Sequence, residues 1–231
     1  MDALKFFENL MEHKFGNPEF LYTALTHSSK SNELGQKYSS CNERLEFLGD
    51  SVLSITVSEY LYNRHPDMHE GEMTKLRATI VCTQSLSDVA EKFDFGRFIM
   101  LGKGEENTGG RHRMSILADA VEALIAALYL DAGFDKAKTW ALRILSENIH
   151  RAENGELFKD YKTTLQEELQ KTQIATLEYV IVSEEGPDHD KTFVAEVRMD
   201  DIILGRGTGK NKKDAQQLAA RDALSKYHRI D

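Results

Sequence analysis

Apolar residues in the first two thirds of the chain recur at spacings of three and four positions, with almost no strand-like alternation. This spacing is typical of amphipathic helices. Asn42 and Ser115 are predicted N-caps, because short polar side chains can bond the free amides of a first helical turn. The glycine-rich segment 102–110 is predicted to be a loop. The predicted helices are 2–13, 18–25, 42–63, 71–93, 115–131 and 135–152.

The pattern changes in the last third of the chain, where short alternating runs replace the helical spacing. These runs cover 177–183, 192–199 and 202–207, between helical patterns at 161–170 and 212–227. The order is helix, three strands, helix. The expected organisation is an all-α domain at 1–152, a polar linker at 153–158 and an α/β domain of α-β-β-β-α order at 159–231.

Composition supports a folded chain. Of its 231 residues, 41% are hydrophobic and 29% are charged, so it can bury a core. The longest apolar run, 123–130, is far shorter than the ~18 residues of a membrane-spanning helix, and the acidic start does not resemble a secretory signal. Cys41 and Cys82 are expected to remain free thiols. We therefore expect a cytoplasmic protein with no membrane partner.

The net charge of −9 argues weakly against a nucleic-acid partner. The charge is unevenly distributed, however, because 159–231 holds 12 basic and 14 acidic residues. Most of the acidity therefore lies in the helical part of the chain.

Three of these acids, Glu43, Glu46 and Asp50, are spaced by three and four residues, which places them on one stripe of a helix. Like charges at this spacing repel, so a positive group must compensate, either Arg44 and other basic side chains or a bound cation. Alternatively, Glu43 is only a solvated helix charge.

A second predicted helix carries Asp119 and Glu122 within a strongly apolar stretch, 116–127. Buried acids are costly unless they bind a metal or are hydrogen-bonded, so pairing with arginines is the alternative. Oxygen ligands without cysteine, and without histidine at helical spacing, suit Mg²⁺ or Mn²⁺. Such a site supports phosphodiester hydrolysis.

Several segments together resemble the bacterial ribonuclease III family, over essentially the whole chain. The segment Glu43-Arg-Leu-Glu-Phe-Leu-Gly-Asp-Ser51 resembles the family signature. Thr26-His-Ser-Ser29, Glu70-Gly-Glu-Met-Thr-Lys-Leu-Arg77 and Asp119-Ala-Val-Glu-Ala123 resemble other family segments, and 161–224 resembles a double-stranded-RNA-binding domain.

The resemblance implies a Mg²⁺-dependent endonuclease that cleaves double-stranded RNA and leaves 5′-phosphate and 3′-hydroxyl ends with a short 3′ overhang. It implies a homodimer, because two sites related by a two-fold axis can cut both strands. It also implies processing of ribosomal-RNA precursors and structured messages, with no organic cofactor.

The family's residue roles carry over to matching positions of this sequence. Asp50 and Glu122 match the carboxylates most important for catalysis, and Glu43 and Glu70 match auxiliary acids. Phe47 matches an aromatic that enters a pocket on the partner subunit, although its spacing also fits an ordinary core residue. The matched metal ligands are Glu46, Asp50, Asp119 and Glu122.

Three candidate RNA contacts lie in the second domain. One is a helix face that could reach the minor groove, and another is a loop with His189. The third is a helix start capped by Asn211, where the helix dipole and the lysines attract phosphate. Solvated surface is the alternative for each. The full set is Gln166, Glu167, Gln170, His189, Lys210, Lys212 and Lys213.

Three rival functions come from other classes. A binding protein with an inactive nuclease domain would be expected to lose its acids, which are all present. A helical Mg²⁺-dependent nucleotide pyrophosphatase would not need the C-terminal module. A structural ribosome-associated factor would leave the buried acids without a purpose.

Overall fold

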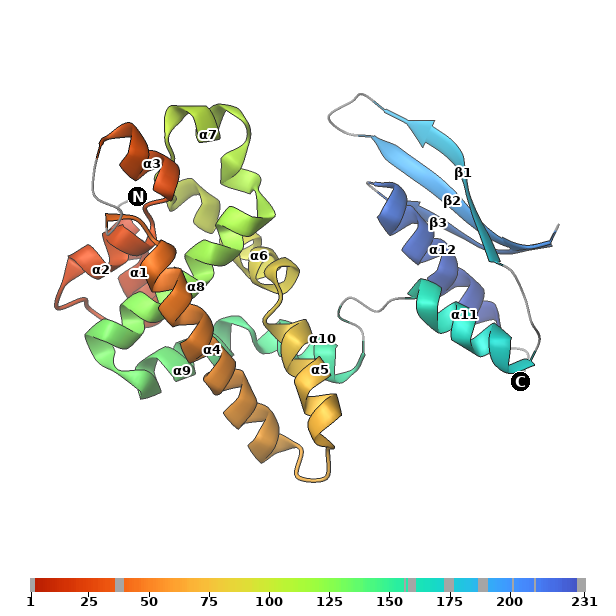
Figure 1. Ribbon diagram of the computed structural model, residues 1–231, viewed down its shortest axis with the longest axis horizontal. Helices are drawn as coiled ribbons and strands as arrows, with labels where there is room; N and C mark the ends of the chain where they lie inside the picture. The colour runs from red at the N-terminus through yellow and green to blue at the C-terminus, as the bar shows by residue number, and fades with distance from the viewer. Residues whose placement is uncertain are drawn as a thin grey trace. The chain divides into compact units, whose positions relative to one another are not determined.

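The computed structural model describes residues 3–35, 40–155, 157, 161–172, 177–186, 191–200, 202–209 and 211–227. The chain divides into two compact units, residues 1–158 and 159–231, each with its own core (Figure 1). We describe each unit by itself.

The first unit is helical and is built around α8. This helix is apolar on all sides from Ile116 to Leu128, apart from its two acids, and it packs against α2, α4, α6 and α9 (Figure 1). Short 3₁₀ turns at Phe95–Phe98 and Gly110–His112 join the later helices. The α-helices are α1 Ala3–Met11, α2 Pro18–Ala24, α3 Ser28–Glu33, α4 Glu43–Arg64, α5 Glu70–Ile80, α6 Thr83–Lys92, α7 Lys103–Asn107, α8 Met114–Ala132, α9 Phe134–Ile144 and α10 Ser146–Glu153.

Two long predicted helices are each divided in two. The segment 71–93 forms α5 and α6, because Cys82 adopts an extended backbone at the start of α6. The segment 135–152 forms α9 and α10, which meet at Leu145. Helical spacing of apolar residues continues across both breaks, so periodicity did not reveal them.

The predictions for the segments around the acids also need correction. Helix α8 begins at Met114, so Ser115 lies inside it and is not the N-cap. Asn42 precedes α4, but its side chain makes no capping hydrogen bond. The predicted loop at 102–110 contains α7, whose first amide, that of Lys103, donates to the Glu33 carboxylate at 2.5 Å.

The second unit packs two helices on a three-stranded antiparallel sheet of order β1-β2-β3, as predicted. Gly207 allows close packing, because a Cβ atom there would lie 2.2 Å from the Ala219 nitrogen in α12. Two observed elements, β2 and α12, have the predicted bounds. The elements are α11 Tyr161–Thr172, β1 Leu177–Glu185, β2 Thr192–Met199, β3 Ile202–Gly209 and α12 Lys212–Tyr227.

The sheet face opposite the helices carries a buried carboxylate that the sequence did not reveal. Glu196 is 1% exposed because Arg198 and Arg206 cover it and donate to its two oxygens.

Among the described residues, no helix is both long and apolar enough to cross a membrane.

Candidate active site

Helices α4 and α8 bring the predicted acids together at a point where their backbones approach closely. Gly49 makes this approach possible, because a Cβ atom at this position would lie 1.9 Å from the carbonyl oxygen of Glu122. Glu46 lies one turn before Gly49, and Asp119 lies one turn before Glu122. The contact between the helices therefore fixes the spacing of the acids.

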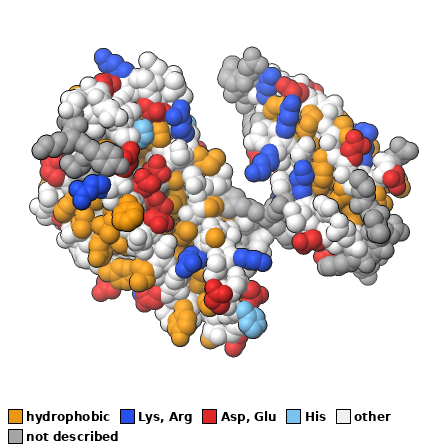
Figure 2. Space-filling model, viewed as in Figure 1, with side chains coloured by type: hydrophobic (Ala, Val, Ile, Leu, Met, Phe, Trp, Pro, Cys, Tyr) orange, Lys and Arg blue, Asp and Glu red, His pale blue; other side chains and the backbone are white. Residues whose placement is uncertain are grey.

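Three of the four predicted metal ligands form a single cluster. Glu46, Asp119 and Glu122 each place a carboxylate oxygen within 4.8 Å of the other two, and all three side chains are partly buried. Asp50, one turn further along α4, is exposed and lies outside this cluster. Figure 2 shows acidic side chains gathered on one face of the first unit, beside a group of hydrophobic side chains.

The negative charge of this cluster is not balanced by protein cations in the described part of the chain. None of its three acids forms a salt bridge there. Arg44, which the sequence offered as a compensating charge, is exposed to solvent. The alternative in which Asp119 and Glu122 pair with arginines therefore has no support among the described residues.

Burial and mutual repulsion shift the titration of the acids. Burial first, and then the neighbouring carboxylates, raise the pKa of Glu122 from its ordinary 4.5 to about 8. The same causes raise the pKa of Asp119 from 3.8 to about 6 and also raise the pKa of Glu46. Without a cation, the cluster therefore retains a proton on Glu122 at neutral pH. A bound cation favours release of this proton.

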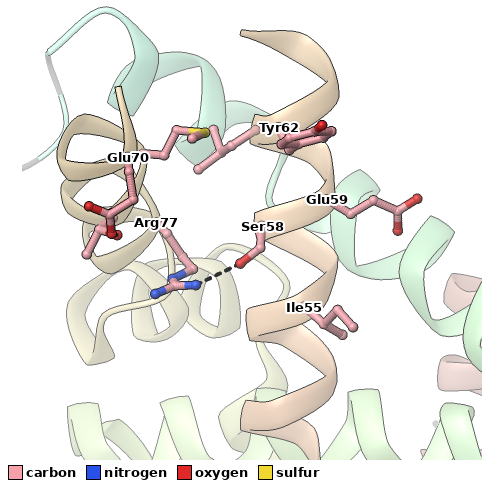
Figure 3. Close-up of a pocket in the computed structure, with 9 residues that line it drawn as sticks. Ile55, Ser58, Glu59, Tyr62, Glu70 and Arg77 are labelled. Carbon is pink, nitrogen blue, oxygen red and sulfur yellow. Dashed lines mark hydrogen bonds between the residues drawn. The ribbon is translucent and has the colours of Figure 1, made fainter. Parts of the chain in front are cut away.

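The auxiliary acids lie in two different places. The charge of Glu43 acts on both Glu46 and Asp119, so Glu43 borders the cluster. Glu70 instead lies on α5, in the wall of a groove of about 480 Å³ between α5 and the second half of α4 (Figure 3). Arg77 in this groove donates to Ser58 at 2.8 Å. Glu70 is thus not part of the cluster in its own chain.

Phe47 is a surface residue rather than a core residue in the single chain, with 78% of its area exposed. It lies next to Glu46 on α4. Ile55 and Tyr62, further along the helix, are 57% and 72% exposed. Their spacing places the three side chains on one stripe of α4. Ser51 and Ser58 lie between them, and three large apolar side chains exposed on one side of a helix indicate an interaction site.

The predicted RNA contacts of the second unit are exposed where they are described. Gln166, Glu167 and Gln170 project from α11, while Leu165 and Leu169 of the same helix are buried.

At the start of α12, the Asn211 side chain accepts from the Asp214 amide at 2.9 Å, which confirms the predicted N-cap. Lys212 and Lys213 are exposed in this first turn. His189 and Lys210 lie outside the described residues.

A carboxylate cluster of metal-binding type on a helical unit, followed by an α-β-β-β-α unit with lysines at a helix N-terminus, fits a nuclease that acts on duplex nucleic acid. A family model described as ribonuclease-III-like matches residues 17–149, and one described as double-stranded RNA binding motif matches 161–227.

Proteins with similar sequences and structures include ribonucleases of this type. "Ribonuclease 3" of Caldanaerobacter subterraneus is 48% identical over 96% of this chain and 97% of its own length. "Ribonuclease 3" of Desulforamulus reducens is 50% identical over 91% of this chain and 86% of its own length. The nuclease domain of ribonuclease III from Campylobacter jejuni has a TM-score of 0.58 and 43% identity, covering 63% of this chain and 97% of that domain.

The chain belongs to the ribonuclease III family. It is an endoribonuclease that cleaves double-stranded RNA, and its second unit is a double-stranded-RNA-binding domain. The predicted family and fold class are confirmed.

Replacing Gly49 by alanine should separate α4 from α8, because the added methyl group has no room beside the Glu122 carbonyl. We expect the free energy of unfolding to fall by about 1–3 kcal/mol, with a loss of RNA cleavage. Urea unfolding and a cleavage assay measure the two effects. Gly71→Ala is the control for stability, since a Cβ atom at Gly71 meets open space. Equal stability of the two variants would contradict the proposed packing constraint.

The raised pKa of Glu122 predicts how the stability of the metal-free chain depends on pH. Between pH 4.5 and about 8, the folded chain keeps a proton on Glu122 that the unfolded chain has lost. The free energy of unfolding should therefore fall as pH rises through this range. Glu122→Gln should make this fall less steep, whereas Glu70→Gln should not. Urea unfolding with a chelator at several pH values tests this, and identical slopes in all three proteins would contradict it.

Proposed function

We propose that Glu46, Asp119 and Glu122, with Asp50 beside them, bind Mg²⁺, or Mn²⁺ in its place, for the cleavage of double-stranded RNA. The main support is the convergence of three carboxylates within 4.8 Å, without a basic partner among the described residues. Oxygen ligands alone suit these hard cations. The hydrolysis requires no organic cofactor.

Each acid has a distinct part in this proposal. A divalent cation supplies an activated water and stabilises the leaving oxygen in phosphodiester hydrolysis. Glu122, the acid with the highest pKa in the cluster, gives up its proton when the cation binds. Asp50 is exposed and therefore accessible to the substrate, and we assign it and Glu122 the largest effects on rate. Glu43 borders the cluster and approaches the RNA.

We further propose that the chain forms a homodimer through the exposed stripe of α4. Phe47 lies near one end of this helix, and the groove lined by Ile55, Tyr62 and Glu70 lies near the other (Figure 3). A two-fold axis that crosses α4 between them would place each Phe47 in the groove of the partner subunit. In the Campylobacter jejuni nuclease domain, flexibility of a region involved in dimer formation has been described.

This arrangement would give Glu70 a role that it cannot have within one chain. Because Phe47 directly follows Glu46, a Phe47 side chain in the groove would bring the acidic cluster of its own subunit towards Glu70 of the partner. Each cleavage site would then combine a cluster from one subunit with Glu70 from the other. Two such sites would cut the two strands and leave 5′-phosphate and 3′-hydroxyl ends with a short 3′ overhang.

For RNA binding, we propose contacts through the α11 face and the start of α12. Gln166, Glu167 and Gln170 would reach the minor groove, and Lys212 and Lys213 would neutralise phosphates. His189 and Lys210 are proposed as further contacts from the sequence resemblance alone.

The proposed substrates are ribosomal-RNA precursors and structured messages in the cytoplasm. Recognition of a duplex mainly by its shape fits a range of structured transcripts. A cytoplasmic location also fits Cys41 and Cys82, neither of which forms a disulfide in the described part of the chain.

The metal-ligand assignment predicts that Glu122→Gln will lose most of its cleavage rate while still binding RNA. Glutamine keeps the shape but removes the charge that holds the cation. Single-turnover cleavage, paired with RNA binding in Ca²⁺, separates the two effects. High Mn²⁺ should restore part of the rate by mass action. Cleavage at the wild-type rate, or an equal loss of binding, would show that Glu122 is only structural.

The dimer assignment predicts that Phe47→Asp will be monomeric and unable to cut both strands, because an unpaired charge is costly to bury. Sedimentation measures the mass, and a hairpin substrate reports cleavage of each strand. Leu34→Asp is the matched control, since Leu34 is 55% exposed and directly follows α3, outside the stripe on α4. A fully active dimer of Phe47→Asp would refute this interface.

Mixed dimers test the role of Glu70 across the interface. A dimer of one Glu122→Gln chain and one Glu70→Gln chain would keep one intact site if Glu70 serves the partner. If Glu70 serves its own chain, both sites would carry a substitution. The mixed dimer would then nick RNA no faster than the mean of the Glu122→Gln and Glu70→Gln homodimers.

The lysines of α12 are expected to act through charge. Replacing both Lys212 and Lys213 by alanine should weaken binding to every duplex. The slope of the logarithm of the binding constant against the logarithm of salt concentration should become less steep by up to about 2. Lys226→Ala is the control, because Lys226 pairs with Asp222 at the far end of the same helix. An unchanged slope in the double variant would exclude these lysines from the contact surface.

A further inference from the structure

His27 is held against the start of the helix that carries the acids. Its backbone N–H donates to the Met100 carbonyl at 3.1 Å. The carbonyl of the preceding residue, Thr26, accepts from the amide of Asn42 at 2.8 Å, and Asn42 comes directly before Glu43 and α4. These backbone bonds hold His27 near Glu43, the acid that borders the cluster.

The hydrogen bonds of the His27 ring determine which nitrogen carries the proton. Nδ1 accepts the backbone N–H of Ser29 at 3.3 Å and lies 2.8 Å from the Ser29 hydroxyl oxygen. That oxygen accepts the Gly102 amide at 2.9 Å, which leaves the hydroxyl hydrogen free to be donated to Nδ1. Two donors directed at Nδ1 place the ring proton on Nε2.

The Nε2–H group is available to a ligand. It forms no hydrogen bond with any described residue. The Nε2 atom is not buried, and the side chain is partly exposed. Burial of the ring lowers the pKa of His27. The carboxylates of Glu105 and Glu43 act in the opposite direction, and the positive charge of Arg113 makes a smaller contribution that lowers the pKa. The ring is therefore neutral at pH 7.

A neutral donor at this position suits a site that must hold both a cation and an anionic strand. A lysine or arginine would repel a divalent cation at the neighbouring carboxylates, whereas a neutral imidazole does not. An RNA strand that reaches the cluster brings phosphate oxygens, which are strong acceptors.

We propose that His27 contacts the RNA during cleavage and that its Nε2–H donates a hydrogen bond to a phosphate oxygen of the cleaved strand. The inference rests on the proposal that the acidic cluster is the cleavage site. It makes His27 a substrate-positioning residue that adds to the acids.

Two substitutions separate this role from the role of His27 in starting α3. Asparagine can still accept the Ser29 amide but does not reach the position of Nε2, so His27→Asn should keep its stability. Its single-turnover cleavage should slow by about 10- to 100-fold, the loss of one hydrogen bond to a charged group. Glutamine reaches the position of Nε2 but loses the Ser29 bond. His27→Gln should therefore be less stable and cut faster than His27→Asn.

His150→Asn is the matched control, because His150 is exposed on α10, and it should cut at the wild-type rate. RNA binding in Ca²⁺ should change little in any of these variants. Wild-type cleavage by His27→Asn, or rates that simply follow stability across both His27 variants, would overturn the proposal.

A measurement on the wild-type protein does not depend on how the variants fold. Sulfur in place of each non-bridging phosphate oxygen near the cut should identify an oxygen whose replacement slows cleavage and is not rescued by Mn²⁺. An oxygen that contacts the metal is rescued, because Mn²⁺ accepts sulfur better than Mg²⁺ does. If every slow position is rescued, His27 makes no such contact.

The outcome for Glu122 shows which proposal has failed. Wild-type cleavage by Glu122→Gln would remove the acidic cluster as the site, and the His27 inference with it. A slow Glu122→Gln with a normal His27→Asn would overturn the His27 inference alone.

Discussion

The first unit is organised around the cost of holding carboxylates together without protein cations. Glu46, Asp119 and Glu122 repel one another in a partly buried setting, and each therefore has a raised pKa. No salt bridge relieves this repulsion among the described residues. The apolar packing of α8 must offset it, and from Ile116 to Leu128 this helix is buried on all sides except where it carries the two acids.

The same constraint explains why small residues lie where α4 meets α8. Gly49 leaves room for the Glu122 carbonyl, and α8 contains five buried alanines, at 118, 120, 123, 126 and 127. With larger side chains at this crossing, the helices would move apart and the acids would no longer lie within 4.8 Å of one another. The local rule that acids avoid buried helices is broken at this cluster, as is common at functional positions, whereas Asp131 near the end of α8 is paired with His13.

The sequence predicted the elements that have a strong period and missed those that depend on tertiary contacts. Helix α12 and strand β2 have their predicted bounds, because the period of each is uninterrupted in the sequence. Helix α3 is short and polar, and it begins where the His27 ring accepts the Ser29 amide. Neither the ring contact nor the break at Cys82 leaves a periodic signal in the sequence.

The acidic cluster was predictable in part. Helical spacing put Glu46 on one stripe and Asp119 with Glu122 on another, and their convergence followed only from the crossing of the two helices. The same spacing did not separate Asp50 from the cluster, because exposure depends on what packs against that turn of α4. Glu70 was assigned by resemblance alone, and its place in a groove on α5 was visible only in the structure.

Charge explains why the two units belong in one chain. The first unit concentrates negative charge where it must receive a polyanion, so its own attraction for RNA is poor until a cation binds. The second unit has nearly balanced charge and places Lys212 and Lys213 at a helix N-terminus, where phosphate is favoured. A tethered RNA-binding domain raises the local concentration of duplex at the acidic site. Under the proposed assignment, the cluster would then need to bind only a cation and the reacting phosphate, while the second unit holds the RNA.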